Sequence, residues 1–171
     1  MIQLVATAII TLSSVFLLGY WFRYTCLLIL AARATQDCDC EIAMAKPLSR
    51  QEVRSMLRER TVTNLHRLCA VAVGNGLSFP EVQSLLREPA VTDLDRLRES
   101  LDRDYRVVLH VLDRAAQGMG KAAFERHMLA INYHFLGTWY PVKRRHSAQG
   151  ARLILEEMSW VVAYFAESVG V

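Results

Sequence analysis

The chain has 171 residues, of which 53% are hydrophobic and 22% are charged, and its formal net charge is +3. After a membrane segment, this length leaves room for one domain with its own core. The net charge is too small to indicate a nucleic-acid partner.

The first stretch, from Ile2 to Phe22, contains no charged residue. At about 1.5 Å per residue, a helix of this length spans roughly the 30 Å hydrocarbon core of a bilayer. Tyr20, Trp21 and Arg23 follow at its end, which is typical of the point where a helix leaves lipid for headgroups. The sequence therefore predicts a transmembrane anchor, and we assign residues 1–34 to the anchor and a juxtamembrane helix.

Basic side chains lie on only one side of this segment. None precedes it, whereas Arg23, Arg33, Lys46 and Arg50 follow it. Because Lys and Arg favour the cytoplasmic side, we expect a single-pass protein with its N-terminus outside and residues 35–171 in the cytoplasm, in a bacterial inner membrane. The missing basic leader also argues against a cleaved signal peptide.

Four consecutive apolar residues, Leu27 to Leu30, come directly after this boundary. On a continuing helix they point to every side, so one small domain covers only part of them. We expect Leu27, Leu28 and Leu30 to dock against the body of the protein or against a partner.

An internal repeat occupies residues 40–68 and 69–97, which align without gaps and share fifteen identical pairs. Each copy carries a Ser-x-x-Glu capping box, at Ser49 and Ser78, that predicts the start of a short helix. A Thr cap at Thr63 or Thr92 then predicts the next helix. Such two-helix units stack on one another, either as a docking surface or only as core.

Three further helices are predicted after the repeat, over residues 93–117, 121–136 and 147–168. The first has the clearest apolar stripe, which predicts that it is the spine of the domain, the central helix against which the others pack. On the second, Phe124, His127, Met128, Ile131 and Phe135 form the predicted apolar side. Residues 137–146 are predicted to be a loop. No stretch shows strand alternation, so the predicted fold is all-α: an anchor followed by a helical domain with a tandem repeat.

The candidates for metal or catalytic chemistry are weak. Cys38, Cys40, His66 and Cys69 lack the spacing of a zinc site, and a reducing compartment favours free thiols at all four cysteines, Cys26 included. We therefore expect no metal, no cofactor and no catalytic residue. His110, His127 and His134 are the residues that a ligand pocket would use if there is one.

The predicted loop places aromatic residues beside cations, a mixture that suits anionic lipid headgroups. Its members are Trp139, Tyr140, Lys143, Arg144 and Arg145. The alternative is a solvated loop with its aromatic rings packed into the core.

The sequence as a whole favours an accessory, scaffold or assembly subunit of a larger membrane complex, acting through protein contacts and not as an enzyme. Its partners would be other subunits and the bilayer. The alternative is a membrane-tethered enzyme, or a ligand or metal sensor, with a helical pocket.

Overall fold

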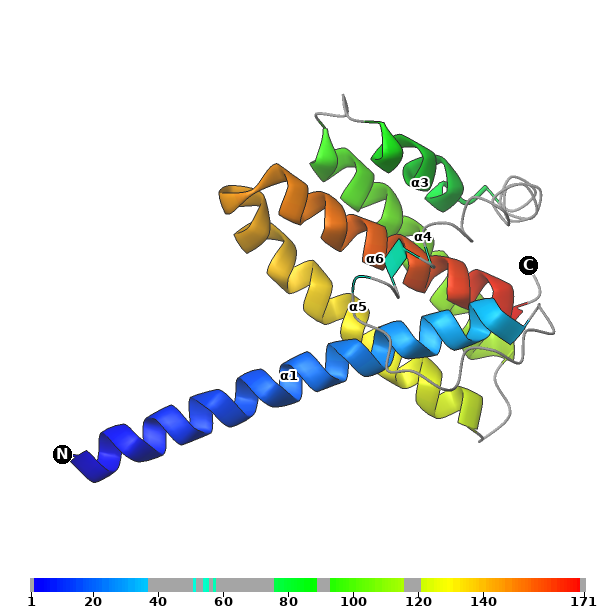
Figure 1. Ribbon diagram of the computed structural model, residues 1–171. Coiled ribbons are helices and arrows are strands. Elements are labelled where there is room, and N and C mark those ends of the chain that lie inside the picture. Colours follow the sequence, from blue (N-terminus) through cyan, green and yellow to red (C-terminus); the bar gives the residue numbers. More distant parts are fainter. Residues whose placement is uncertain are drawn as a thin grey trace. The chain divides into compact units, whose positions relative to one another are not determined.

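The computed structural model describes residues 2–36, 51, 54, 55, 57, 76–88, 93–115 and 121–169. Every element in these residues is a helix, which confirms the all-α class for the described part of the chain. The helices are α1 (Ile2–Gln36), α3 (Phe79–Arg87), α4 (Leu94–Ala115), α5 (Lys121–His146) and α6 (Ala148–Val169) (Figure 1). The chain divides into two compact units, Met1–Arg58 and Glu59–Val171.

Helix α1 is one unbroken helix, and its segment Val5–Ala32 is long and apolar enough to cross a membrane (Figure 1). Its hydroxyl groups bond back to carbonyls one turn earlier, so they do not oppose insertion into lipid. Thr11, for example, donates to the Thr7 carbonyl at 2.9 Å, and Ser14 donates to the Ile10 carbonyl at 2.9 Å.

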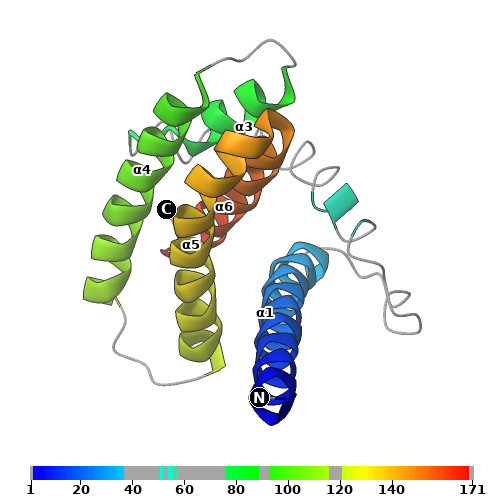
Figure 2. The same cartoon turned by 90° about the vertical axis from the view of Figure 1, so that its left-hand side faces the viewer.

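The second unit is built around α6, which packs against α3, α4 and α5. Figure 1 shows α5 and α6 as an antiparallel hairpin, and Figure 2 shows α3 near one end of α4 and α6. A helix with apolar residues on most of its sides is stable in an interior, and every residue of α6 from Glu157 to Ala166 is buried. Its buried residues are Ala151, Ile154, Leu155, Glu157, Met158, Ser159, Trp160, Val161, Val162, Ala163, Tyr164, Phe165 and Ala166.

Helix α4 buries its predicted stripe against this core. The buried members are Leu94, Leu97, Leu101, Tyr105, Val108 and Leu112. The expectation that α4 is the spine of the domain is nevertheless wrong, because α6 is the helix that packs against the other three.

The face of α5 that packs inward is not the predicted one. Phe124, Ile131 and Phe135 are 64%, 45% and 44% exposed, and His127 is exposed as well. The buried residues are instead Leu129, Asn132, Tyr133, Leu136 and Tyr140. This helix is apolar on two faces, so helical spacing alone did not identify the one that meets the core.

Helix α5 also continues through the predicted loop to His146, with Pro141 inside it. A proline removes one backbone donor and costs helix stability. Contacts on both sides of Pro141 offset this cost: the Tyr140 hydroxyl donates to Asp95 Oδ1 at 2.8 Å, and Arg144 Nε lies 3.8 Å from Asp95 Oδ2.

Helix α3 begins directly after Ser78, where the predicted capping box places a helix start. Ser78 makes no side-chain cap bond, however, so the hydrogen bond of the predicted box is wrong. Asp93 Oδ1 accepts the Arg96 N–H at 3.1 Å at the start of α4. Ser49, Thr63 and Thr92 lie outside the described residues.

Ser147 and Ser78 give a matched pair of variants. Ser147 Oγ accepts the Gly150 N–H at 3.1 Å and caps α6. We expect Ser147→Ala to lower the free energy of unfolding by about 0.5–2 kcal/mol. Ser78→Ala should change it by less than about 0.5 kcal/mol. Urea unfolding of the full chain in detergent, followed by fluorescence, measures both, and an equal loss in the two variants would show that this cap assignment is wrong.

Candidate functional site

An open groove of about 440 Å³ lies between α4 and α5 of the second unit. Its lining residues are Arg98, Asp102, Tyr105, Arg106, Leu109, Tyr133, His134, Gly137 and Thr138. The groove thus combines two guanidinium groups, one carboxylate, two phenols and an imidazole. Of the three histidines considered for a pocket, only His134 lines it.

Polar pairs across this groove join α4 to α5. The Tyr133 hydroxyl donates to Asp102 Oδ1 at 2.8 Å, and the Tyr140 hydroxyl makes the matching bond to Asp95. Arg98 lies with its guanidinium carbon 5.0 Å from the centre of the Tyr140 ring, and its Nε is 3.6 Å from Asp102 Oδ2. We call these contacts the polar seam; three of them link α4 to α5, and the Arg98–Asp102 pair lies within α4.

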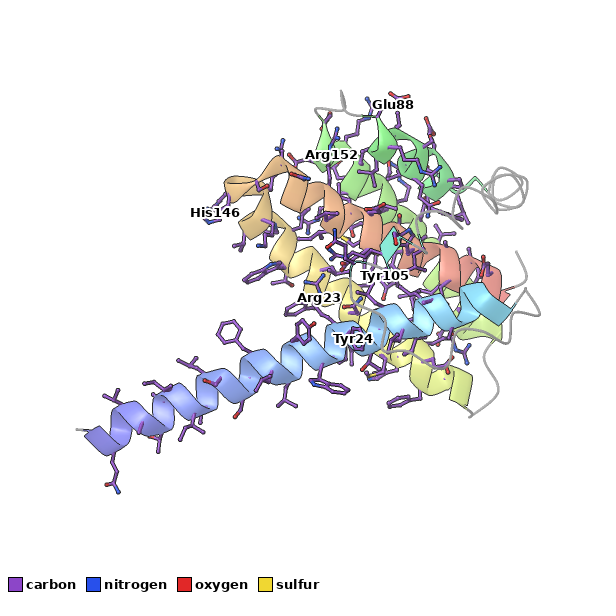
Figure 3. The ribbon with its side chains drawn as sticks, viewed as in Figure 1. Arg23, Tyr24, Glu88, Tyr105, His146 and Arg152 are labelled. Carbon is purple, nitrogen blue, oxygen red and sulfur yellow. The ribbon has the colours of Figure 1, made fainter. Side chains whose placement is uncertain are left out.

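An aromatic cluster lies at the same place. The Tyr105 and Tyr133 rings are stacked, with centroids 3.8 Å apart and an interplanar angle of 8°. His134 meets the Tyr105 ring edge-on at 5.7 Å, and Phe165 of α6 approaches it at 5.9 Å. Tyr105, labelled in Figure 3, is 4% exposed, and its hydroxyl has no hydrogen-bond partner among the described residues.

Three of the buried tyrosines, Tyr105, Tyr133 and Tyr140, hold their protons more tightly than free tyrosine. Burial raises the pKa of Tyr105 from 10.0 to about 12. Burial also raises the pKa of Tyr133 and of Tyr140, and the neighbouring carboxylates Asp102 and Asp95 raise them further. All three phenols are therefore protonated at neutral and mildly alkaline pH.

These shifts predict a loss of stability at alkaline pH. Because the folded pKa values lie above the unfolded value, the unfolded chain releases protons first as the pH rises past about 10. The free energy of unfolding should therefore fall as the pH rises from about 10 towards 12, and it should fall less steeply in Tyr133→Phe. Urea unfolding at several alkaline pH values tests this, and a stability that stays constant over that range would contradict it.

The predicted headgroup residues divide into two groups. Trp139 is 40% exposed, and Lys143 and Arg145 are exposed. Tyr140 is 1% exposed and Arg144 faces Asp95, so these two serve the polar seam in the structure. Sequence reasoning missed this because Asp95 is distant in the chain.

On α1, Tyr20 and Trp21 are 52% and 65% exposed, and Arg23 is partly exposed. Leu27 and Leu30 are buried, and Leu28 is 37% exposed. Cys26 is a buried thiol. Among the described residues no group of three or more His, Cys, Asp or Glu could hold a metal ion, and Cys38, Cys40, His66 and Cys69 lie outside them.

A second surface feature is the outer face of α5. Its members are Phe124, Ile131, Phe135, Trp139 and Val142, which recur at helical spacing and are between 40% and 64% exposed. The Phe135 and Trp139 rings stack with centroids 6.4 Å apart. An exposed apolar stripe of this length on a packed domain is typical of a contact surface.

Comparison of the chain with protein-family models, curated proteins and solved structures finds no match.

Proposed function

We propose that this chain is a single-pass membrane protein that serves as an accessory, scaffold or assembly subunit of a larger membrane complex. Helix α1 is the anchor, with the N-terminus outside and the helical domain in the cytoplasm. The domain works through contacts with other subunits and with the bilayer, and it catalyses no reaction.

The observation that supports this proposal is the polar seam. Asp102 and Asp95 are each engaged by a tyrosine hydroxyl from the facing helix, at 2.8 Å in both cases. Asp102, the carboxylate that lines the groove, is thus already engaged in joining α4 to α5. Such a domain offers a fixed shape to its partners rather than a reacting group.

The tandem repeat belongs to this proposal. In the second copy, the two predicted helices correspond to α3 and to the start of α4. We propose that the first copy repeats this hairpin and extends the docking surface. The first copy lies almost entirely outside the described residues.

Photo-crosslinking in intact membranes tests the docking role. A crosslinking amino acid replaces Leu28, the exposed residue among the predicted docking leucines, or Val107, a 46% exposed apolar residue of α4. Asp113, an exposed charged residue of α4, is the control position. We expect one discrete protein adduct from Leu28 or Val107 and none from Asp113. Adducts to lipid alone at both positions would contradict the proposal.

A ligand sensor or enzyme is the second candidate, and one observation favours it. The Tyr105 hydroxyl is buried beside the groove without a partner among the described residues, and His134 is exposed there. A buried polar group of this kind carries a cost that a bound ligand could relieve. This candidate predicts that the purified full chain carries a metal or chromophore that Tyr105→Phe loses, whereas the docking role predicts no such change.

A further inference from the structure

We propose that the outer face of α5 lies on an anionic bilayer surface and gives the domain a second membrane contact beyond α1. This inference rests on the proposed anchoring of the chain by α1. Companion subunits then meet the domain at its other faces.

The apolar part of this contact is the outer face of α5 itself. Its five large side chains follow one side of the helix, from Phe124 to Val142, and the core face is formed by other residues such as Leu129 and Leu136. A helix lying in a membrane interface needs this arrangement, because its apolar side enters the acyl boundary while its other side stays with the protein or with water. Trp and Phe, the residue types at positions 139 and 135, are moreover common on the apolar face of interfacial helices.

The charge of α5 agrees with an anionic surface. The helix has five Lys and Arg residues and one acidic residue, Glu125. The rest of the chain has fifteen Lys and Arg and sixteen Asp and Glu, which leaves it with a formal charge of −1. The positive net charge of the protein is therefore carried by α5, and the Glu125 carboxylate accepts the Tyr164 hydroxyl at 3.2 Å.

The cations are concentrated at one end of the outer face. Lys143, Arg145 and His146 are exposed in the last turn of α5, and Figure 3 shows His146 at the tip of the α5–α6 hairpin. Basic residues in a last turn also suit the helix dipole, which by itself would explain one or two cations. It does not explain the apolar side chains that continue the same face over the length of the helix.

Because α1 already tethers the domain to the membrane, the outer face of α5 needs only a weak affinity for the bilayer to stay bound. A domain joined to a membrane-spanning helix experiences a high effective concentration of lipid surface, so a modest affinity keeps it bound. Anionic lipids attract nearby Lys and Arg within about a Debye length, and aromatic side chains add to this attraction. A bilayer also offers a broad anionic surface to a face that is both apolar and basic, and this is why we favour it over a protein partner.

Hydroxyl-radical footprinting of the full chain tests the inference. One copy is placed in each nanodisc, made of phosphatidylcholine with or without phosphatidylglycerol, and the oxidation rates of Phe135 and Trp139 are read by mass spectrometry. We expect phosphatidylglycerol to lower both rates by at least about threefold. His110, exposed on α4, should oxidise at the same rate in both lipids.

A pair of variants tests the charge argument. Lys143→Gln with Arg145→Gln should restore most of the oxidation of Trp139, whereas Arg103→Gln, which removes an exposed cation of α4, should not. Equal protection in both lipids would overturn the anionic preference. Unprotected rings, or protection only with two copies per disc, would overturn the bilayer contact altogether.

These nanodiscs contain no companion protein, so a failure of the docking role leaves the footprint unchanged. Failure of the anchoring itself would be seen separately, as chain that remains outside the discs.

Discussion

Phe165→Ala is expected to lower the free energy of unfolding of the second unit by about 3–5 kcal/mol. Phe165 is fully buried on α6, and its ring approaches Tyr105 at 5.9 Å and Tyr164 at 5.9 Å. Its removal leaves a cavity at the point where α4 meets the central helix, and close-packed neighbours fill such a cavity only in part.

Phe124→Ala is the matched control, because Phe124 is 64% exposed on α5. It should change stability by less than about 0.5 kcal/mol in detergent. Urea unfolding of the full chain, followed by the fluorescence of buried Trp160, compares the two variants. Similar losses in both would show that α6 is not the centre of the core.

Asp104→Ala is expected to cost about 1–3 kcal/mol, although the residue lies in the middle of α4. Asp104 is 1% exposed, and its Oδ2 accepts the Ser78 N–H at 2.6 Å at the start of α3. The carboxylate of one helix thus caps another, in the place where the Ser78 side chain makes no cap bond. Alanine would leave this partly buried donor without its acceptor.

Asp104→Asn separates the hydrogen bond from the charge. Burial raises the pKa of Asp104. The backbone hydrogen bonds from Ser78 and Phe79 and the charge of Arg103 lower this pKa, but their effect is smaller than that of burial. The folded chain therefore keeps this proton to a higher pH than the unfolded chain, so the contribution of Asp104 to stability falls as the pH rises above about 4. Asparagine keeps an acceptor and should remove this dependence.

Unfolding curves at acidic and neutral pH measure these effects. At neutral pH Asp104→Asn should be clearly more stable than Asp104→Ala. Equal losses in the two variants would contradict the cap assignment.

Helices α1 and α4 were predictable from local patterns, because each of these two patterns has a single interpretation. An uncharged run about as long as a bilayer core is thick gives α1, and the stripe from Leu94 to Leu112 gives α4 together with its buried face. On α5 the pattern does not show which face packs against the core, since Phe135 and Leu136 lie on different apolar faces. The choice depends on α4 and α6, which a local pattern does not include.

The polar seam was beyond sequence reasoning for a similar reason. Tyr140 and Arg144 lie among cationic and aromatic residues in the sequence, and this pattern predicted a contact with lipid headgroups. In the structure Tyr140 donates a hydrogen bond to Asp95, and Arg144 forms an ion pair with it. The same applies to Pro141, whose helix-breaking tendency is offset by that contact. Conversely, the exposure of Trp139, Lys143 and Arg145 agrees with the predicted headgroup set, which stays a prediction.

Thiol labelling of intact cells tests the single-pass topology most directly. A membrane-impermeant maleimide should modify Ile2→Cys in intact cells. It should not modify the wild-type cysteines or His146→Cys, an exposed position on the domain, until the cells are lysed. Labelling of His146→Cys from outside, with Ile2→Cys protected, would contradict the proposed orientation and the cytoplasmic docking role with it.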